Sequence, residues 1–309
     1  MQVILDTALP FFALVFCGYG AGRLGLLSEA SAAGLNTFVF YFALPAFIFS
    51  LLATTPVDDA LNASFAAAYL IAGLGTAAVA AFLGVWFFGA GRGAAVLRGA
   101  SASLGNNGYM GLPLIAAAFG SEAAIAMALG LTLEVVVMMP LAIVILEADK
   151  GPESRLSELI STVASALVKN PLIISIAAGA AVSFSGLELF PPVGNFAELL
   201  GDAAGPCALF TLGATLAGRE ISGGLAEVSY LTFFKLAAHP AAMWATMSLF
   251  GVNPLWTKVA ILGASLPVAA NVFILARQYD EYVDRTSGAI LVSTIVSVIT
   301  VSALLILLA

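Results

Sequence analysis

Long apolar runs recur along almost the whole sequence, and they restrict the fold more than any other feature. Only 9% of the 309 residues are charged, whereas a soluble domain carries about a quarter. Runs of about 20 residues are long enough for a helix to cross a bilayer, and the alternating polarity of a membrane barrel is absent. We therefore expect an all-α integral membrane protein. Its ten predicted transmembrane helices cover residues 3–22, 31–53, 63–88, 98–119, 123–146, 167–186, 196–217, 227–250, 256–277 and 286–308.

Lysines and arginines are distributed unevenly over the connections between these spans. The odd-numbered connections and adjoining span ends hold Arg23, Arg92, Arg98, Lys150, Arg155, Lys169, Arg219, Arg277 and Arg285. The even-numbered connections hold only Lys258. Because cytoplasmic loops are enriched in basic residues, we expect the odd connections in the cytoplasm and both termini on the extracytoplasmic side of the inner membrane. Asp6 and the lack of a basic region favour a first membrane helix over a signal peptide.

The chain divides into two halves of five spans each. A charged connecting segment, 147–166, separates a first half, 1–146, from a second half, 167–309. An odd number of spans places the second half upside down relative to the first. The sequences ALPAFIFSLLA (43–53) and AGPCALFTLGA (204–214) share Ala, Pro, Phe, Leu and Ala at matched positions. This pattern predicts an inverted repeat, as in many secondary transporters; the alternative is coincidence in a biased composition.

Two spans in corresponding positions carry a polar break. The fourth contains SLGNNGYMGLPL (103–114), in which Pro113 and three glycines disfavour a continuous helix. The ninth contains Ser265-Leu-Pro267-Val-Ala-Ala-Asn271. Paired discontinuous helices indicate a transport site, and their free N–H groups favour an anion. The alternative is a pair of proline kinks, with Asn106 and Asn107 hydrogen-bonded to neighbouring helices.

Residues 106–114 (NNGYMGLPL) resemble the fourth-helix motif of the auxin efflux carrier family. That family includes plant auxin exporters and bacterial permeases assigned to malonate or malate. Other matching stretches are Lys169-Asn-Pro171, Gly201–Gly205, Leu209–Gly213, Leu266-Pro267 and Phe273–Arg277. The resemblance covers the whole chain, and the short central loop is similar to that of bacterial members. Asn271-Val272 stands where plant members have a second proline.

The resemblance implies a fold of the bile-acid-sodium-symporter type with two parts. A scaffold would comprise about 1–53 and 167–217, and a transport domain about 63–146 and 227–309. Helices 4 and 9 of the transport domain would cross at their breaks, and transport would be elevator-like. In the family, the asparagine that opens the fourth-helix motif, here Asn106, contacts the substrate carboxylate. The resemblance also implies a homodimer formed through the scaffold.

Three ionisable residues lie inside predicted spans. Glu134 is in the middle of span 5, where a lone carboxylate costs on the order of 3 kcal/mol. By resemblance, it replaces a glutamine that lines the plant carriers' site. Lys235 and His239 are spaced i, i+4 and share one face of span 8. The three residues are candidates for coupling transport to H⁺ or Na⁺, and Glu134 is a candidate partner of Lys235. The alternative is that all three have structural roles.

These patterns predict a secondary transporter of a small organic carboxylate, such as a malonate- or malate-like dicarboxylate or an auxin-like monocarboxylate. The alternatives are a sodium-coupled organic anion symporter and, less favoured, a channel. No phosphate-binding loop or paired nucleophile and base is present, so we expect neither an ATP-driven pump nor an enzyme. We expect no cofactor, metal site or nucleic-acid partner. The predicted substrate-binding residues are Asn106, Asn107, Gly108, Tyr109, Pro113, Pro267, Asn271, Ser50 and Thr211.

Overall fold

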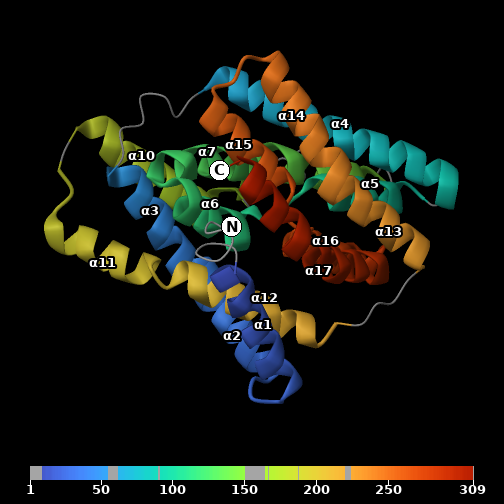
Figure 1. Ribbon diagram of the computed structural model, residues 1–309, viewed down its shortest axis with the longest axis horizontal. Coiled ribbons are helices and arrows are strands. Elements are labelled where there is room, and N and C mark those ends of the chain that lie inside the picture. The colour runs from blue at the N-terminus through green and yellow to red at the C-terminus, as the bar shows by residue number, and fades with distance from the viewer. Residues whose placement is uncertain are drawn as a thin grey trace.

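The computed structural model describes residues 9–54, 62–89, 91–149, 164–165, 167–186, 188–219 and 224–308, and the regular elements within these ranges are helices (Figure 1). The all-α prediction is confirmed over these ranges. The first half contains α1 (Leu9–Arg23), α2 (Glu29–Phe38), η2 (Val39–Ala43), α3 (Leu44–Thr54), α4 (Ala63–Phe88), α5 (Arg92–Ser103), η3 (Asn107–Gly111), α6 (Leu112–Phe119), α7 (Ser121–Leu133), η4 (Glu134–Met138) and α8 (Met139–Asp149). The second half contains α10 (Pro171–Ser185), α11 (Pro191–Gly201), α12 (Ala204–Ala217), α13 (Leu225–Phe233), η5 (Phe234–Ala238), α14 (His239–Leu249), α15 (Pro254–Ala264), α16 (Ala270–Tyr279) and α17 (Val283–Leu308).

Among the residues that the structure describes, five helices are long and apolar enough to cross a membrane by length and composition. They are Glu29–Thr54, Ala63–Phe88, Ser121–Asp149, Pro191–Ala217 and Val283–Leu308. The other five predicted spans fall on helices that are shorter, interrupted or more polar. Most of the predicted connecting segment, 147–166, lies outside the described residues.

Four prolines each follow a wide π-helical turn. The turns η2, η3, η4 and η5 end two residues before Pro45, Pro113, Pro140 and Pro240. Proline lacks an N–H and its ring clashes with the carbonyl four residues earlier. A wider turn relieves that clash while the chain continues as a helix. The distortions therefore follow directly from the sequence, and two of these turns contain Glu134 and Lys235.

The helices pack in two groups (Figure 1). In the first helix group, α1 packs on α12, and α3 packs on α10 and α11. The second helix group contains α4 to α8 and α13 to α17, with α4 between α5 and α14, and α13 against α17. The groups meet where α12 contacts η3 and α6, and where α3 contacts α7. Each group combines helices from both halves of the sequence, so neither half forms a separate body.

Candidate functional site

Two helices break at the same point and pair through their backbones. α5 ends at Ser103 and α15 ends at Ala264, and each chain resumes as a helix a few residues later. Gly105 and Val268 form an isolated antiparallel bridge between the two unwound segments. The Asn106 N–H donates to the Pro267 carbonyl at 2.9 Å, and the Ala269 N–H donates to the Leu104 carbonyl at 3.1 Å. The two predicted breaks are thus present and face each other, and we call this contact the crossing.

The close approach at the crossing requires glycine at position 105. A Cβ there would lie 2.9 Å from the Gly263 carbonyl oxygen, closer than such atoms normally approach. That oxygen belongs to the backbone, so it cannot move aside as a flexible side chain could. Gly105 of SLGNNGYMGLPL therefore serves packing as well as unwinding.

A small cavity of about 50 Å³ lies beside the crossing. Of the residues predicted to bind substrate, Asn106, Gly108, Tyr109 and Asn271 line it. Glu134, predicted as a coupling residue, lines it as well. Further lining residues are Phe40, Leu44, Leu104, Gly105, Leu131, Val135, Met139, Asn170, Leu172, Ala269 and Ala270. Residues from distant parts of the sequence thus converge on one hollow.

Polar groups without protein partners face this cavity. Asn106 is 4% exposed, and its side-chain amide has no hydrogen bond to any part of the chain that the structure describes. The helical segments that begin at Asn107 and Ala270 both start at the cavity. The first N–H groups of a helix have no partner within it and carry partial positive charge. The site therefore offers hydrogen-bond donors without a fixed cation.

Asn107 has a different environment from its neighbour. It is 1% exposed, and its Nδ2 donates to Glu134 Oε1 at 2.7 Å and to the Tyr69 hydroxyl at 3.1 Å. Tyr69 in turn donates to Glu134 Oε1 at 3.0 Å. Two donors therefore satisfy one carboxylate oxygen of Glu134, which also lines the cavity. The Oδ1 atom of Asn107 is buried and has no hydrogen-bond partner within the described ranges.

Lys235 and His239 are also buried behind the cavity. Lys235 Nζ donates to the Ala264 carbonyl at 2.5 Å, and it lies 3.2 Å from His239 Nδ1. Glu134 and Lys235 are near enough for their charges to interact. They do not form a direct ion pair in the described structure, since the printed partners of each side chain are other groups. Glu134 and Lys235 therefore lie near each other, as predicted, but are not directly paired.

The remaining predicted site residues lie away from the cavity lining. Pro113 packs near Gly205 of the first helix group, and Pro267 contributes its backbone carbonyl to the crossing. Thr211 is buried in α12, where its hydroxyl donates to the Cys207 carbonyl at 2.6 Å. Ser50 lies in α3, and its carbonyl accepts a hydrogen bond from the Thr54 hydroxyl.

Two polar residues of this region were not predicted as site residues. Asn170 lines the cavity and also caps α10, where its Oδ1 accepts from the Leu172 N–H at 2.9 Å. Its position before Pro171 indicated only a helix start. Tyr69 lies in the middle of the apolar α4, and only the fold places it on Glu134. A lone tyrosine in an apolar run gives no sequence signal for such a contact.

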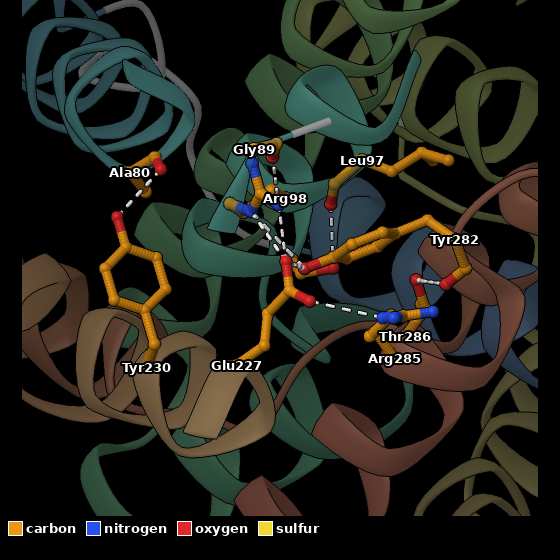
Figure 2. Close-up of polar contacts among 10 residues, drawn as sticks. Ala80, Gly89, Leu97, Arg98, Glu227, Tyr230, Tyr282, Arg285 and Thr286 are labelled. Atoms are coloured by element: carbon orange, nitrogen blue, oxygen red, sulfur yellow. Dashed lines mark hydrogen bonds and ion pairs between the residues drawn. The ribbon is translucent and has the colours of Figure 1, made fainter. Parts of the chain in front are cut away.

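A second buried polar cluster lies around Glu227 (Figure 2). Its carboxylate accepts hydrogen bonds from Arg98, from the Tyr282 hydroxyl at 2.6 Å and from Arg285 at 3.2 Å. Arg98 lies over the Tyr282 ring, 5.4 Å from its centroid. Burial and the hydrogen bond to Glu227 raise the pKa of Tyr282, so its hydroxyl remains a donor. The cluster joins α5, α13 and α17, all within the second helix group.

Comparison with known proteins agrees with these features. A family model described as "Membrane transport protein" matches residues 3–305. A Rhizobium meliloti (strain 1021) protein named "Putative malonate transporter" is 36% identical, over 99% of this chain and 96% of its own. Auxin efflux carrier component 5 of Arabidopsis thaliana is 24% identical, over 95% of this chain and 93% of its own. An uncharacterized transporter of Methanothermobacter thermautotrophicus is 26% identical, over 96% of this chain and 95% of its own.

The family model covers nearly the whole chain, and the rhizobial relative matches it almost end to end. Both are described as transporters rather than enzymes, and the apolar helices agree with a protein that crosses the membrane several times. The resemblance of the chain to the auxin efflux carrier family is confirmed by the family model and the plant relative. The chain therefore belongs to the membrane transport protein family that includes the auxin efflux carriers.

Proposed function

We propose that the protein is a secondary transporter that moves a small organic carboxylate across the inner membrane. One observation carries this proposal: the Asn106 amide, which has no hydrogen-bond partner among the described residues, and the starts of two broken helices lie at the same cavity. A carboxylate placed there accepts hydrogen bonds from Asn106, Asn271 and free backbone N–H groups. Gly108 and Tyr109 complete the substrate side of the cavity.

The composition of the site supports binding that is reversible. None of the described residues that line the cavity is basic. Helix ends and amides attract an anion without the strong, localised charge of an arginine. A transport site must release its substrate on the other side of the membrane, and a site of this kind permits release.

The size of the cavity favours compact substrates. One water molecule needs roughly 10–15 Å³ of such volume, so about 50 Å³ corresponds to a few waters. A short dicarboxylate such as malonate fits that scale better than an auxin-like acid with a fused ring system. The printed name of the rhizobial relative points to the same substrate class.

The packing pattern supports an inverted repeat of five plus five helices. If spans 1 to 5 correspond to spans 6 to 10, the contact of α1 with α12 has its counterpart in that of α10 with α3. The contact of α15 with α7 likewise has its counterpart in that of α17 with α5. The crossing joins spans 4 and 9, which occupy equivalent positions. Such repeats are common in transporters that alternate access around one site.

We propose an elevator mechanism for this architecture. In it, the second helix group, about 63–146 and 227–309, is the transport domain and carries the crossing. The first helix group, about 1–53 and 167–217, is the scaffold, through which two copies dimerise. Both termini are extracytoplasmic, as the distribution of basic residues indicates. The apolar outer faces contact the lipid bilayer.

Counterflow in proteoliposomes tests the proposal. Wild-type protein loaded with unlabelled malonate is expected to accumulate labelled malonate, and other mono- and dicarboxylates are expected to compete according to size. Asn106→Ala removes a hydrogen bond to a charged group, worth about 1.5–3 kcal/mol, and should weaken binding roughly 10- to 100-fold. Asn195→Ala, in the exposed part of α11, is the matched control. Unchanged uptake of every transported acid by Asn106→Ala would contradict the proposal.

A further inference from the structure

The buried ammonium of Lys235 lies at the end of a broken helix. α15 ends at Ala264, and its last carbonyl oxygen accepts a hydrogen bond from Lys235 Nζ at 2.5 Å. The last carbonyls of a helix have no partner within it and carry partial negative charge. In transporters with discontinuous helices, such ends coordinate the coupling cation. Lys235 therefore places a positive charge at a position suited to a free cation.

The other groups around this ammonium are also those that a cation attracts. His239 Nδ1 lies 3.2 Å away, and an ammonium there makes this nitrogen the acceptor. Glu134 is near enough to interact through its charge. Lys235 Nζ and the unpartnered Asn107 Oδ1 each lie 3.3 Å from the point that a Cβ on Gly105 would occupy. A carbonyl and an imidazole nitrogen thus contact the ammonium, and a carboxylate and an amide oxygen lie nearby.

The position of the lysine excludes two simpler explanations. Its side chain is 0% exposed, so the ammonium does not extend to the membrane surface, as long basic side chains near helix ends do. It also forms no direct ion pair with Glu134 within the described residues, so it is not a simple buried salt bridge. Its contact is with a helix end that exists only because α15 breaks at the crossing.

We propose that Lys235 is a tethered cation that occupies a monovalent-cation site behind the crossing. The Ala264 carbonyl and His239 Nδ1 contact the ammonium, and Glu134 and Asn107 Oδ1 are the nearby groups that a free cation would draw in. With the ammonium in place, no free sodium ion is needed to hold the two broken helices together or to balance Glu134. Without it, the site is open to a small cation from solution. The cation site itself does not depend on the proposed transport function; only the expected effect of Lys235 on the transport rate rests on it.

Removal of the tethered cation tests the proposal through thermal stability. Purified wild-type protein in detergent should have the same Tm in sodium, potassium, methylammonium and choline chloride at equal ionic strength. Lys235→Ala should have a lower Tm in choline, which is too large for the site. Sodium or methylammonium should raise the Tm of Lys235→Ala by several degrees. Lys258→Ala, on the same helix as Ala264, is the control and should show no such dependence.

A second pair of variants covers the case in which Lys235→Ala does not fold. Lys235→Met keeps most of the side-chain volume but leaves Glu134 without its nearby positive charge, so its Tm should fall and should not respond to added cations. Glu134→Gln removes the opposite charge. If the ammonium balances Glu134, the double variant Glu134→Gln/Lys235→Met should have a higher Tm than Lys235→Met alone, because an unpaired buried charge is costly.

Three results would overturn the inference: a sodium-dependent Tm in the wild-type protein, a Lys235→Ala variant that folds but responds to no cation, or additive losses in the double variant. These readouts need no substrate. Failure of wild-type carboxylate counterflow would contradict the proposed function and leave the cation site standing. Where counterflow is observed, Lys235→Ala should lose rate several-fold in choline and regain it in sodium or methylammonium.

Discussion

The Asn107 amide nitrogen donates to Glu134 Oε1 across 2.7 Å, while the side-chain amide of the adjacent Asn106 makes no hydrogen bond with the described residues and lines the cavity. The two asparagines are neighbours of the same residue type, and only the family resemblance distinguished them in the sequence. The unwound chain at residues 104–106 directs one of them into a buried network and leaves the other for a ligand. Substitution of Asn107 should therefore lower stability, whereas substitution of Asn106 should reduce transport and leave stability nearly unchanged.

Asn107→Ala should destabilise the protein more than Asn106→Ala. It removes a donor from a buried carboxylate, and a buried polar group without its partner costs about 1–3 kcal/mol. Thermal unfolding in detergent should show a clearly lower Tm for Asn107→Ala and a nearly unchanged Tm for Asn106→Ala. Equal losses of Tm in the two variants would contradict the assignment of separate roles.

Gly105→Ala should weaken the crossing. The new methyl group would meet the Gly263 carbonyl oxygen at 2.9 Å, and overpacking of this kind costs about 1–3 kcal/mol. Gly75→Ala is a suitable control because nothing lies within 4 Å of its added Cβ. We expect a lower Tm and reduced counterflow for Gly105→Ala, with Gly75→Ala like the wild type. A Gly105→Ala variant as stable as this control would show that the backbones approach less closely than described.

Glu227→Ala should be far more damaging than Arg285→Ala, although the two side chains contact each other (Figure 2). Loss of Glu227 leaves Arg98 buried without its carboxylate, which typically costs about 3–5 kcal/mol. Arg285 is 45% exposed, and pairs of this type contribute about 0–1 kcal/mol. The measurement is Tm in detergent for both variants. Similar Tm values for the two would argue against a buried anchor at Glu227.

Phe40→Ala should widen the range of transported acids. Phe40 lines the cavity from η2, in the first helix group. Its truncation removes ring volume from a space of about 50 Å³ without touching Asn106 or Asn271. Larger monocarboxylates should then inhibit malonate counterflow more strongly than in the wild type. Phe184→Ala, an exposed position in α10, provides the control; an unchanged inhibition profile in Phe40→Ala would place the substrate elsewhere.

Much of the fold and part of the site follow from the sequence. The length of the apolar runs predicts helices, and the prolines predict where those helices distort. Pro113 with its glycines and Pro267 predict two breaks, because missing N–H groups and low helix propensity act locally. Asn106, Asn107, Glu134, Lys235 and His239 were recognisable because polar side chains are costly in an apolar span.

Only the tertiary structure decides how these residues are paired. Tyr69 comes from an otherwise unmarked helix to donate to Glu134, and Asn170 reaches the cavity from the second half of the sequence. Lys235 lies against the Ala264 carbonyl rather than in a direct ion pair with Glu134. Composition and proline placement are properties of short stretches of chain, so the sequence determines which residues need partners. The partners themselves come from helices that are distant in the sequence, so they are decided only when the whole chain packs.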